Sequence, residues 1–243
     1  MPVTALPALM AFANTTDAAI LDLSLPFSSG TVAPANSIPW LRITTTTIST
    51  TPGAQIVSVN FDTGGLFAPG SIPLGSGLNG NEFIDSVFLN IGNEDTTIDL
   101  SQISASVHSS SGMSPPSLPI SVGKDSYKAD GDKHLYDARI DFATGGDNSV
   151  RFTSGDTLSL YFTYTGSGTF VADYFNALNY EPGKSEGIYT AASHVQATTG
   201  GGSAWIASDL NTSTVPEPSS GVLSMLTATA CCVFARKRRD LKA

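Results

Sequence analysis

The chain has 243 residues, of which 41% are hydrophobic, and a formal net charge of −9 at pH 7. An acidic chain repels nucleic acid and anionic lipid headgroups, so we expect no nucleic-acid partner. Both cysteines, Cys231 and Cys232, lie near the C-terminus, which excludes a disulfide or a thiolate metal site from the rest of the chain. The length between the two ends is enough for one domain with a sizeable core.

The N-terminal residues 1–18 have an apolar stretch from Val3 to Ala13 that is followed by small residues. This pattern is typical of a signal peptide or of a remnant of one, although no basic residue precedes the apolar stretch. A first strand or a disordered end is the alternative. With the leader interpretation, the sequence predicts an exported protein.

Residues 19–210 alternate apolar and polar side chains with the period of two that half-buried strands show. In residues 156–165, for example, Leu158, Leu160 and Phe162 are separated by polar or smaller side chains. Further strands are predicted at 18–24, 41–50, 54–61, 82–91, 96–107, 134–142, 168–175 and 187–197, with Gly, Pro, Asn and Asp between many of them. Residues 171–180 alternatively form a short helix. The sequence therefore predicts an all-β domain, an antiparallel β-sandwich of jelly-roll type.

Residues 124–137 form the predicted loop richest in carboxylates, with Asp125, Asp130, Asp132 and Asp137. Carboxylate oxygens are the ligands that calcium prefers, so these residues are a candidate calcium site. The alternative is an exposed charged turn, neutralised by the lysines of the same loop. Apart from calcium, we expect no cofactor.

The tryptophans Trp40 and Trp205 are candidates for stacking on sugar rings if they lie on a face of the domain, whereas in the core they fill volume. No Gly-x-Ser-x-Gly motif occurs, and the histidines lack metal-ligand spacing. We therefore predict a protein that is not an enzyme and assign no catalytic residue. Sequence alone does not exclude a catalytic pair of carboxylates from remote strands, as in a glycan hydrolase.

The C-terminal residues 211–243 differ from the rest of the chain. A linker over 211–218 contains Val215, Pro216, Glu217 and Pro218, and an uncharged run over 219–235 follows it. As a helix this run is about 25 Å long, at the lower limit for crossing a bilayer core. The last residues, 236–243, open with the cluster Arg236, Lys237, Arg238 and Arg239. Such a cluster favours a cytoplasmic C-terminus, so we predict a single transmembrane helix. A buried helix of a soluble domain is the alternative.

The order of these parts resembles the tripartite PEP-CTERM sorting signal of exported bacterial proteins, a tail also named the ice-binding protein C-terminal domain. That second name is no evidence that this chain binds ice. The segments 89–92, 126–142, 152–164 and 191–208 resemble, more loosely, an uncharacterised region found ahead of such tails. The resemblance implies export, a transient anchor in the inner membrane and recognition of the tail by an exosortase.

From these observations we expect an exported protein of the bacterial cell envelope or extracellular matrix that is a substrate of an exosortase. An exopolysaccharide-binding module is the alternative, and a secreted glycan hydrolase is a more distant one. The families with this tail are associated with bacteria that produce exopolysaccharide.

Overall fold

Antiparallel strands account for most of the described structure. The computed structural model describes residues 18–26, 39–66, 81–92, 98–112, 118–129, 135–146, 149–178, 189–198 and 202–208. The strands are β1 (Ala18–Pro26), β2 (Leu41–Thr51), β3 (Ala54–Asp62), β4 (Phe83–Leu89), β5 (Ile103–Ser111), β6 (Ile120–Lys128), β7 (Leu135–Asp141), β8 (Phe152–Thr153), β9 (Thr157–Tyr164), β10 (Ala191–Thr198) and β11 (Gly202–Ser208). Short 3-10 helices, η1 (Leu100–Gln102) and η2 (Ala172–Asn176), lie before β5 and after β9.

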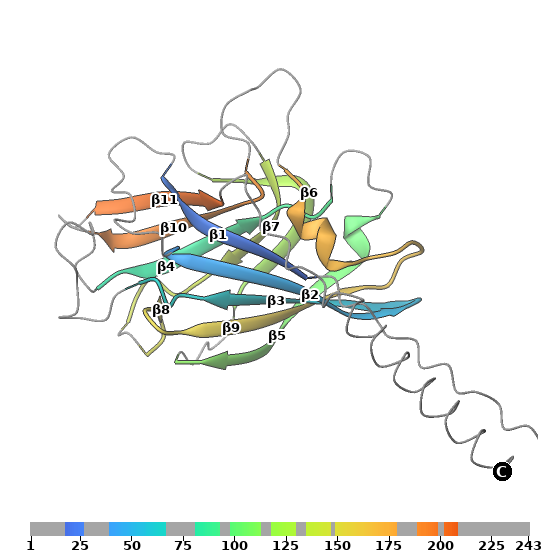
Figure 1. The fold of residues 1–243 in the computed structure, drawn as a ribbon, viewed down its shortest axis with the longest axis horizontal. Coiled ribbons are helices and arrows are strands. Elements are labelled where there is room, and N and C mark those ends of the chain that lie inside the picture. The colour runs from blue at the N-terminus through green and yellow to red at the C-terminus, as the bar shows by residue number, and fades with distance from the viewer. Residues whose placement is uncertain are drawn as a thin grey trace, which may run out of the picture. The chain divides into compact units, whose positions relative to one another are not determined.

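All strands belong to one sheet in the order β5-β9-β3-β2-β1-β11-β10-β4-β7-β6, and β8 pairs with β4 outside this path (Figure 1). The paired strands are antiparallel, which confirms the predicted all-β antiparallel class. The terminal strands β5 and β6 approach each other, so the sheet is nearly closed. The sequence predicts two packed sheets, but the described strands form a single ladder that curls on itself, as strand twist favours.

The period of two predicted from the sequence is seen in the burial of the side chains. In β9, Leu158, Leu160, Phe162 and Tyr164 are buried, whereas the residues between them are half-buried. Most buried apolar residues of β1, β2, β3, β4, β7, β9, β10 and β11 join one core inside the curved sheet. Opposite walls of the sheet therefore stabilise each other through shared apolar packing.

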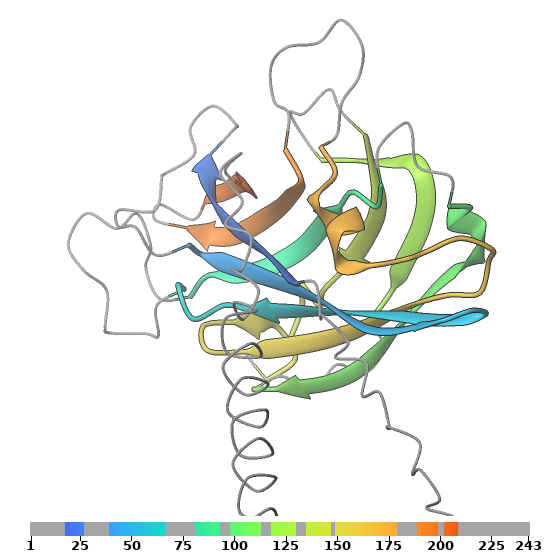
Figure 2. The same ribbon diagram turned by 45° about the vertical axis from the view of Figure 1, so that its right-hand side comes forward.

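The segment 168–178, which follows β9 and contains η2, packs into this core. Figure 2 shows η2 (orange) on the inner side of the curved sheet. Its Phe170 and Phe175 are fully buried. The segment is held by Gln55 of β3, whose Nε2 donates to the Gly168 carbonyl and whose Oε1 accepts from the Phe170 N–H, both at 2.7 Å.

The threonines of β2 explain why this segment is not the strand predicted at 168–175. Thr45 Oγ1 donates to the Ala172 carbonyl, and Thr47 Oγ1 accepts from the Ala172 N–H at 2.9 Å. Because these buried side chains satisfy backbone groups of the segment, it needs no strand partner. The alternative prediction of a short helix at 171–180 is closer to the observed 3-10 helix.

Some elements were not predicted from the sequence. The short β8, together with β6 and β11, is missing from the predicted strands, and residues 100–102 of the predicted strand 96–107 form η1 instead. In β6 the alternation is interrupted by an irregularity between Val122 and Tyr127, where Asp125 adopts a φ of 48°. An interrupted period gives no strand signal in the sequence.

The chain ends, with the predicted linker 211–218, helix 219–235 and basic tail 236–243, lie outside the described residues, as does most of the leader 1–18. Its last residue, Ala18, begins β1. Within the described ranges, none of the helices has the length and apolar character needed to cross a bilayer.

Candidate functional site around Trp205

The two tryptophans lie in different environments. Trp40 precedes β2 and is only 1% exposed, within the main core. It is therefore not available to stack on a sugar ring, and the core interpretation holds for this residue. Trp205 in β11 is half-buried and belongs to a second, smaller apolar cluster.

The second cluster lies on the outer side of the sheet, over β11, β10, β4 and β7. On these strands Ala204, Val195 and Val87 point into the main core, so Trp205, His194 and Phe88 point the opposite way. His194 is the cross-strand partner of Trp205, and their rings stack with centroids 4.5 Å apart and 18° between planes.

Phe88 connects the Trp205 ring to the neighbouring strands. Its ring centroid lies 5.7 Å from that of Trp205 and 5.8 Å from that of Tyr136. The Arg139 guanidinium lies over the Phe88 ring at 5.6 Å, and Arg139 Nε donates to Asp141 Oδ1 at 2.7 Å. A cation–π contact of this kind holds the arginine across the aromatic surface.

Asp85 brings a carboxylate to the same side. The pairing of β4 with β10 shifts between His194 and Val195, which leaves Asp85 as an extra residue on β4. Such a bulge redirects a side chain. Asp85 Oδ2 lies 2.8 Å from His194 Nδ1 and accepts from Gln196 Nε2, and Asp85 Oδ1 accepts from Ser86 Oγ at 2.8 Å.

Burial of Asp85 acts to raise its pKa, but the hydrogen bonds from His194, Gln196 and Ser86 outweigh this effect and lower the pKa of the carboxyl. Asp85 is therefore ionised at neutral pH, and it fixes the orientation of the imidazole. We call Trp205, His194, Phe88, Arg139 and Asp85 the Trp205 cluster.

The Trp205 cluster combines the half-buried rings of Trp205 and His194 and the buried ring of Phe88 with an exposed cation and a fixed carboxylate. Aromatic rings of this kind stack on the apolar face of a sugar ring, while the charged and polar groups at the rim bind hydroxyls. In the Asp85–His194 pair a carboxylate also orients an imidazole, an arrangement in which histidine can act as a general base. Among the described residues, however, no hydroxyl or thiol donates to the His194 ring.

The candidate calcium residues are only partly described. Asp130 and Asp132 lie outside the described residues, whereas Asp125 and Asp137 are in β6 and β7. Asp137 is buried, and its two oxygens accept from the backbone N–H groups of Asp125 and Ile91, each at 2.9 Å. Burial raises the pKa of Asp137, although these two hydrogen bonds oppose the effect.

Within the described residues, no group of three or more His, Cys, Asp or Glu side chains is arranged to hold a metal ion. The structure does bring Asp125 and Asp137 together. The Asp137 carboxylate joins β7 to the irregular part of β6 at Asp125 and to Ile91, which follows β4. The calcium site stays a prediction.

The sorting residues Val215, Pro216, Glu217 and Pro218 and the basic cluster Arg236, Lys237, Arg238 and Arg239 lie outside the described residues. Comparison of the chain with models of protein families, with curated proteins and with solved structures gives no match. The resemblance of the tail to the PEP-CTERM signal is thus supported by the sequence motifs alone.

Proposed function

We propose that the chain is an exported, non-enzymatic protein of the bacterial cell envelope or extracellular matrix and a substrate of an exosortase. The observation that carries the proposal is the order of the tail: a Pro-Glu-Pro triplet, an uncharged apolar run and a basic end. In this proposal residues 1–18 are the leader, and residues 19–210 are the antiparallel β domain. Residues 219–235 are a transmembrane helix with the basic tail in the cytoplasm.

The sorting proposal is tested by changing both Pro216 and Pro218 to Ala in a cell that has the exosortase. We expect the variant to accumulate as an unprocessed form in the membrane fraction, detected by its mass on an immunoblot. A matched control changes the prolines Pro115 and Pro116 of the body to Ala. Normal shortening of the Pro216/Pro218 variant would refute the recognition role of the triplet.

A second candidate function is binding of exopolysaccharide by the β domain, and the Trp205 cluster favours it. The half-buried Trp205 supplies apolar ring surface, and the buried Phe88 ring packs against it. The exposed Arg139 and the half-buried Asp141 supply hydrogen-bonding groups at the rim. Aromatic surface flanked by polar side chains suits the alternating apolar faces and hydroxyls of sugars.

This second function is tested by a pull-down with the producer's own polysaccharide. We expect Trp205→Ala to reduce binding, whereas Leu178→Ala, which truncates a side chain that is 43% exposed, leaves binding unchanged. Equal binding by wild type and Trp205→Ala contradicts a role for this cluster. Release of reducing sugar during the same incubation would instead support the more distant alternative, a glycan hydrolase.

A further inference from the structure

A second outer surface lies on strands β2, β3, β9 and β5, on the opposite part of the ladder from the Trp205 cluster. Along these strands Ile43, Val59 and Leu160 point into the core. The residues between them point outward and are mostly Thr, Ser and Asn. We define the hydroxyl face by Thr44, Thr46, Asn60, Ser159, Tyr161 and Ser106.

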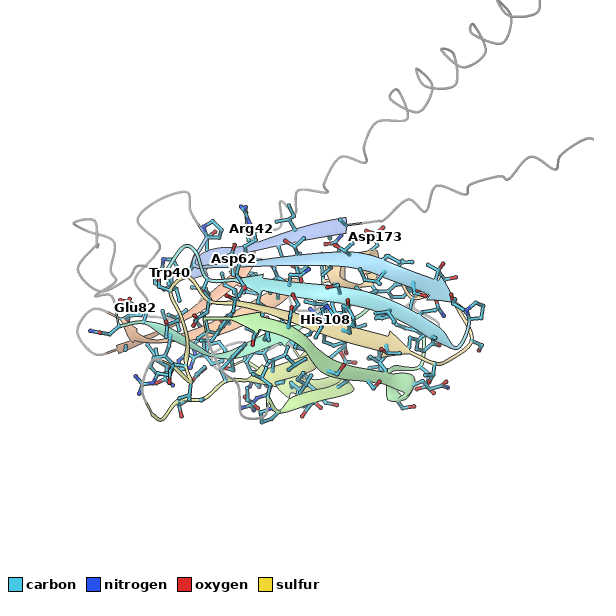
Figure 3. All side chains as sticks on the ribbon, turned by 90° about the horizontal axis from the view of Figure 1, so that it is seen from below. Trp40, Arg42, Asp62, Glu82, His108 and Asp173 are labelled. Carbon is cyan, nitrogen blue, oxygen red and sulfur yellow. The ribbon has the colours of Figure 1, made fainter. Side chains whose placement is uncertain are left out.

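The strand register arranges these side chains in rows across the sheet. One row runs from Thr44 through Asn60 to Ser159. The next runs from Thr46 through Ser58 and Tyr161 to Ser106. Neighbouring strands lie about 4.8 Å apart, which sets the spacing of the side chains within a row. Ser58 is buried, so the second row presents Thr46, Tyr161 and Ser106. Figure 3 shows β2, β3, β9 and β5 side by side.

No side chain in these two rows carries a formal charge, in a chain whose net charge is −9. Charged groups on the outer side of β2 and β3 occur at one end, where Figure 3 labels Arg42 and Asp62. Arg42 binds Asp22 through two hydrogen bonds, of 2.7 and 2.9 Å. The rows therefore offer no cation for a uronate or sulfate group and no surplus of anions for a cationic partner.

The centre of the face is fixed by its own hydrogen bonds. Asn60 Oδ1 accepts from Ser159 Oγ and from Ser58 Oγ, and Asn60 Nδ2 donates to the Thr44 carbonyl at 3.4 Å. These bonds connect three strands and hold the side chains of Asn60, Ser58 and Ser159 in one orientation before any ligand arrives. Preorganised groups lose less conformational entropy when they bind.

An aromatic pair stands beside these rows. The His108 and Tyr161 rings stack with centroids 4.0 Å apart and 13° between planes. His108 lies where the register of β5 against β9 shifts between Val107 and Ser109, so a bulge directs the imidazole toward Tyr161. The pair comes from two strands and adds flat apolar surface to a face that is otherwise made of hydroxyls.

We propose that the hydroxyl face binds an uncharged polysaccharide, which lies flat across β3, β9 and β5. Hydroxyl and amide groups donate and accept hydrogen bonds, as the hydroxyls of a neutral sugar do. The His108–Tyr161 pair supplies a surface on which a sugar ring can stack. This inference rests on the proposal that the β domain binds exopolysaccharide. It adds a second binding surface, separate from the Trp205 cluster, and names the class of polysaccharide that this second surface binds.

The test is affinity gel electrophoresis of the full chain in mild detergent, with hydroxyethylcellulose or galactomannan as neutral probes and alginate as the charged probe. We expect the neutral probes to retard the wild type and alginate not to do so. Tyr161→Ala and Ser106→Glu should each weaken binding about tenfold. Because Ser106 is exposed on a terminal strand of the sheet, its substitution leaves the core intact.

Ser121→Glu adds the same charge at an exposed position of β6 and should bind like wild type. Trp205→Ala should also retain binding, which separates this inference from the role proposed for the Trp205 cluster. Circular dichroism and the melting temperature check that each variant is folded. The inference is overturned by retardation in alginate alone, by an absence of retardation in both neutral probes, or by loss of binding confined to Trp205→Ala. The inference is also overturned if the wild type self-associates, Ser106→Glu abolishes this self-association and no neutral polysaccharide binds. In that case the face binds a second copy of the chain.

Discussion

Gln55 provides the sharpest test of how the curved sheet holds the segment 168–178. The side chain is 2% exposed, and its amide group forms hydrogen bonds of 2.7 Å with both the Gly168 carbonyl and the Phe170 N–H. Gln55→Ala leaves the buried Phe170 N–H without this acceptor, which costs about 1–3 kcal/mol. Gly168 is exposed, so water can replace the donor to its carbonyl and this loss is smaller.

With the loss of packing by the Gln55 side chain included, we expect Gln55→Ala to lower the free energy of unfolding by about 2–4 kcal/mol. A comparison with Gln55→Glu separates the two hydrogen bonds. A carboxylate still accepts from the Phe170 N–H but cannot donate to the Gly168 carbonyl. Burial beside a carbonyl raises the folded-state pKa of this carboxyl, so the variant loses stability as pH rises through the interval between the unfolded and folded pKa values.

The assay is urea unfolding of the full chain in mild detergent, followed by tryptophan fluorescence, because Trp40 is buried in the core. Gln102→Ala is the matched control, since the Gln102 side chain is exposed and bonds only Asp99 among the described contacts. This control should change stability by less than about 0.5 kcal/mol. A Gln55→Ala effect as small as that of the control would refute the role of Gln55 in holding the segment.

Three further predictions concern carboxylates. Asp85 has a lowered pKa, so its contribution to stability is present above the unfolded pKa and is lost as pH falls through the folded pKa. Asp85→Asn should lower the free energy of unfolding at pH 7 by about 1–3 kcal/mol. In urea titrations, the variant should also lose less stability than wild type between pH 7 and pH 3. An unchanged pH profile would contradict this prediction. Asp137→Asn should lower the free energy of unfolding by about 1–3 kcal/mol, because the new amide N–H group would face the backbone N–H of Ile91 or Asp125. A variant as stable as wild type in urea would contradict the role of Asp137 as the acceptor of these two bonds. If the 124–137 segment binds calcium, the ion should stabilise the fold by about 2.7 kcal/mol at a hundredfold excess over Kd. The joint change of Asp130 and Asp132 to Asn should remove this gain, and equal melting temperatures in calcium and chelator would leave the segment as a charged turn.

The predictable part of the fold comes from local alternation. The strands β2, β3, β7 and β9 agree with the predicted ranges within a residue or two, because each presents one apolar row to the core and one polar row outward. The β6 strand was missed because a wide irregularity breaks its period near Asp125. The segment 168–178 was misassigned because its buried aromatic residues resemble a strand, while its backbone partners are side chains far away in sequence.

The candidate site was predictable only in its residue types. Sequence selected both Trp40 and Trp205, but only the fold shows that the first is enclosed and the second lies outside the core. The alternation in β10 places His194 and Gln196 on one face, which is a signal that sequence reasoning could have used. Nothing local to Asp85 indicates a bulge that turns its carboxylate toward them.

By itself, the sequence determined the all-β class, the acidic character, the cysteine-free body and the distinct composition of residues 211–243, because composition and short-range periodicity depend on neighbouring residues. The tertiary structure decided which strands pair, that one ladder nearly closes, and that Asp85 meets His194 across 109 positions of the chain. Register between distant strands is selected by the packing of the whole core, and a shift of one residue would turn each strand's side chains to the other face. Both proposed binding surfaces depend on that register, since each is assembled from strands that are remote in sequence.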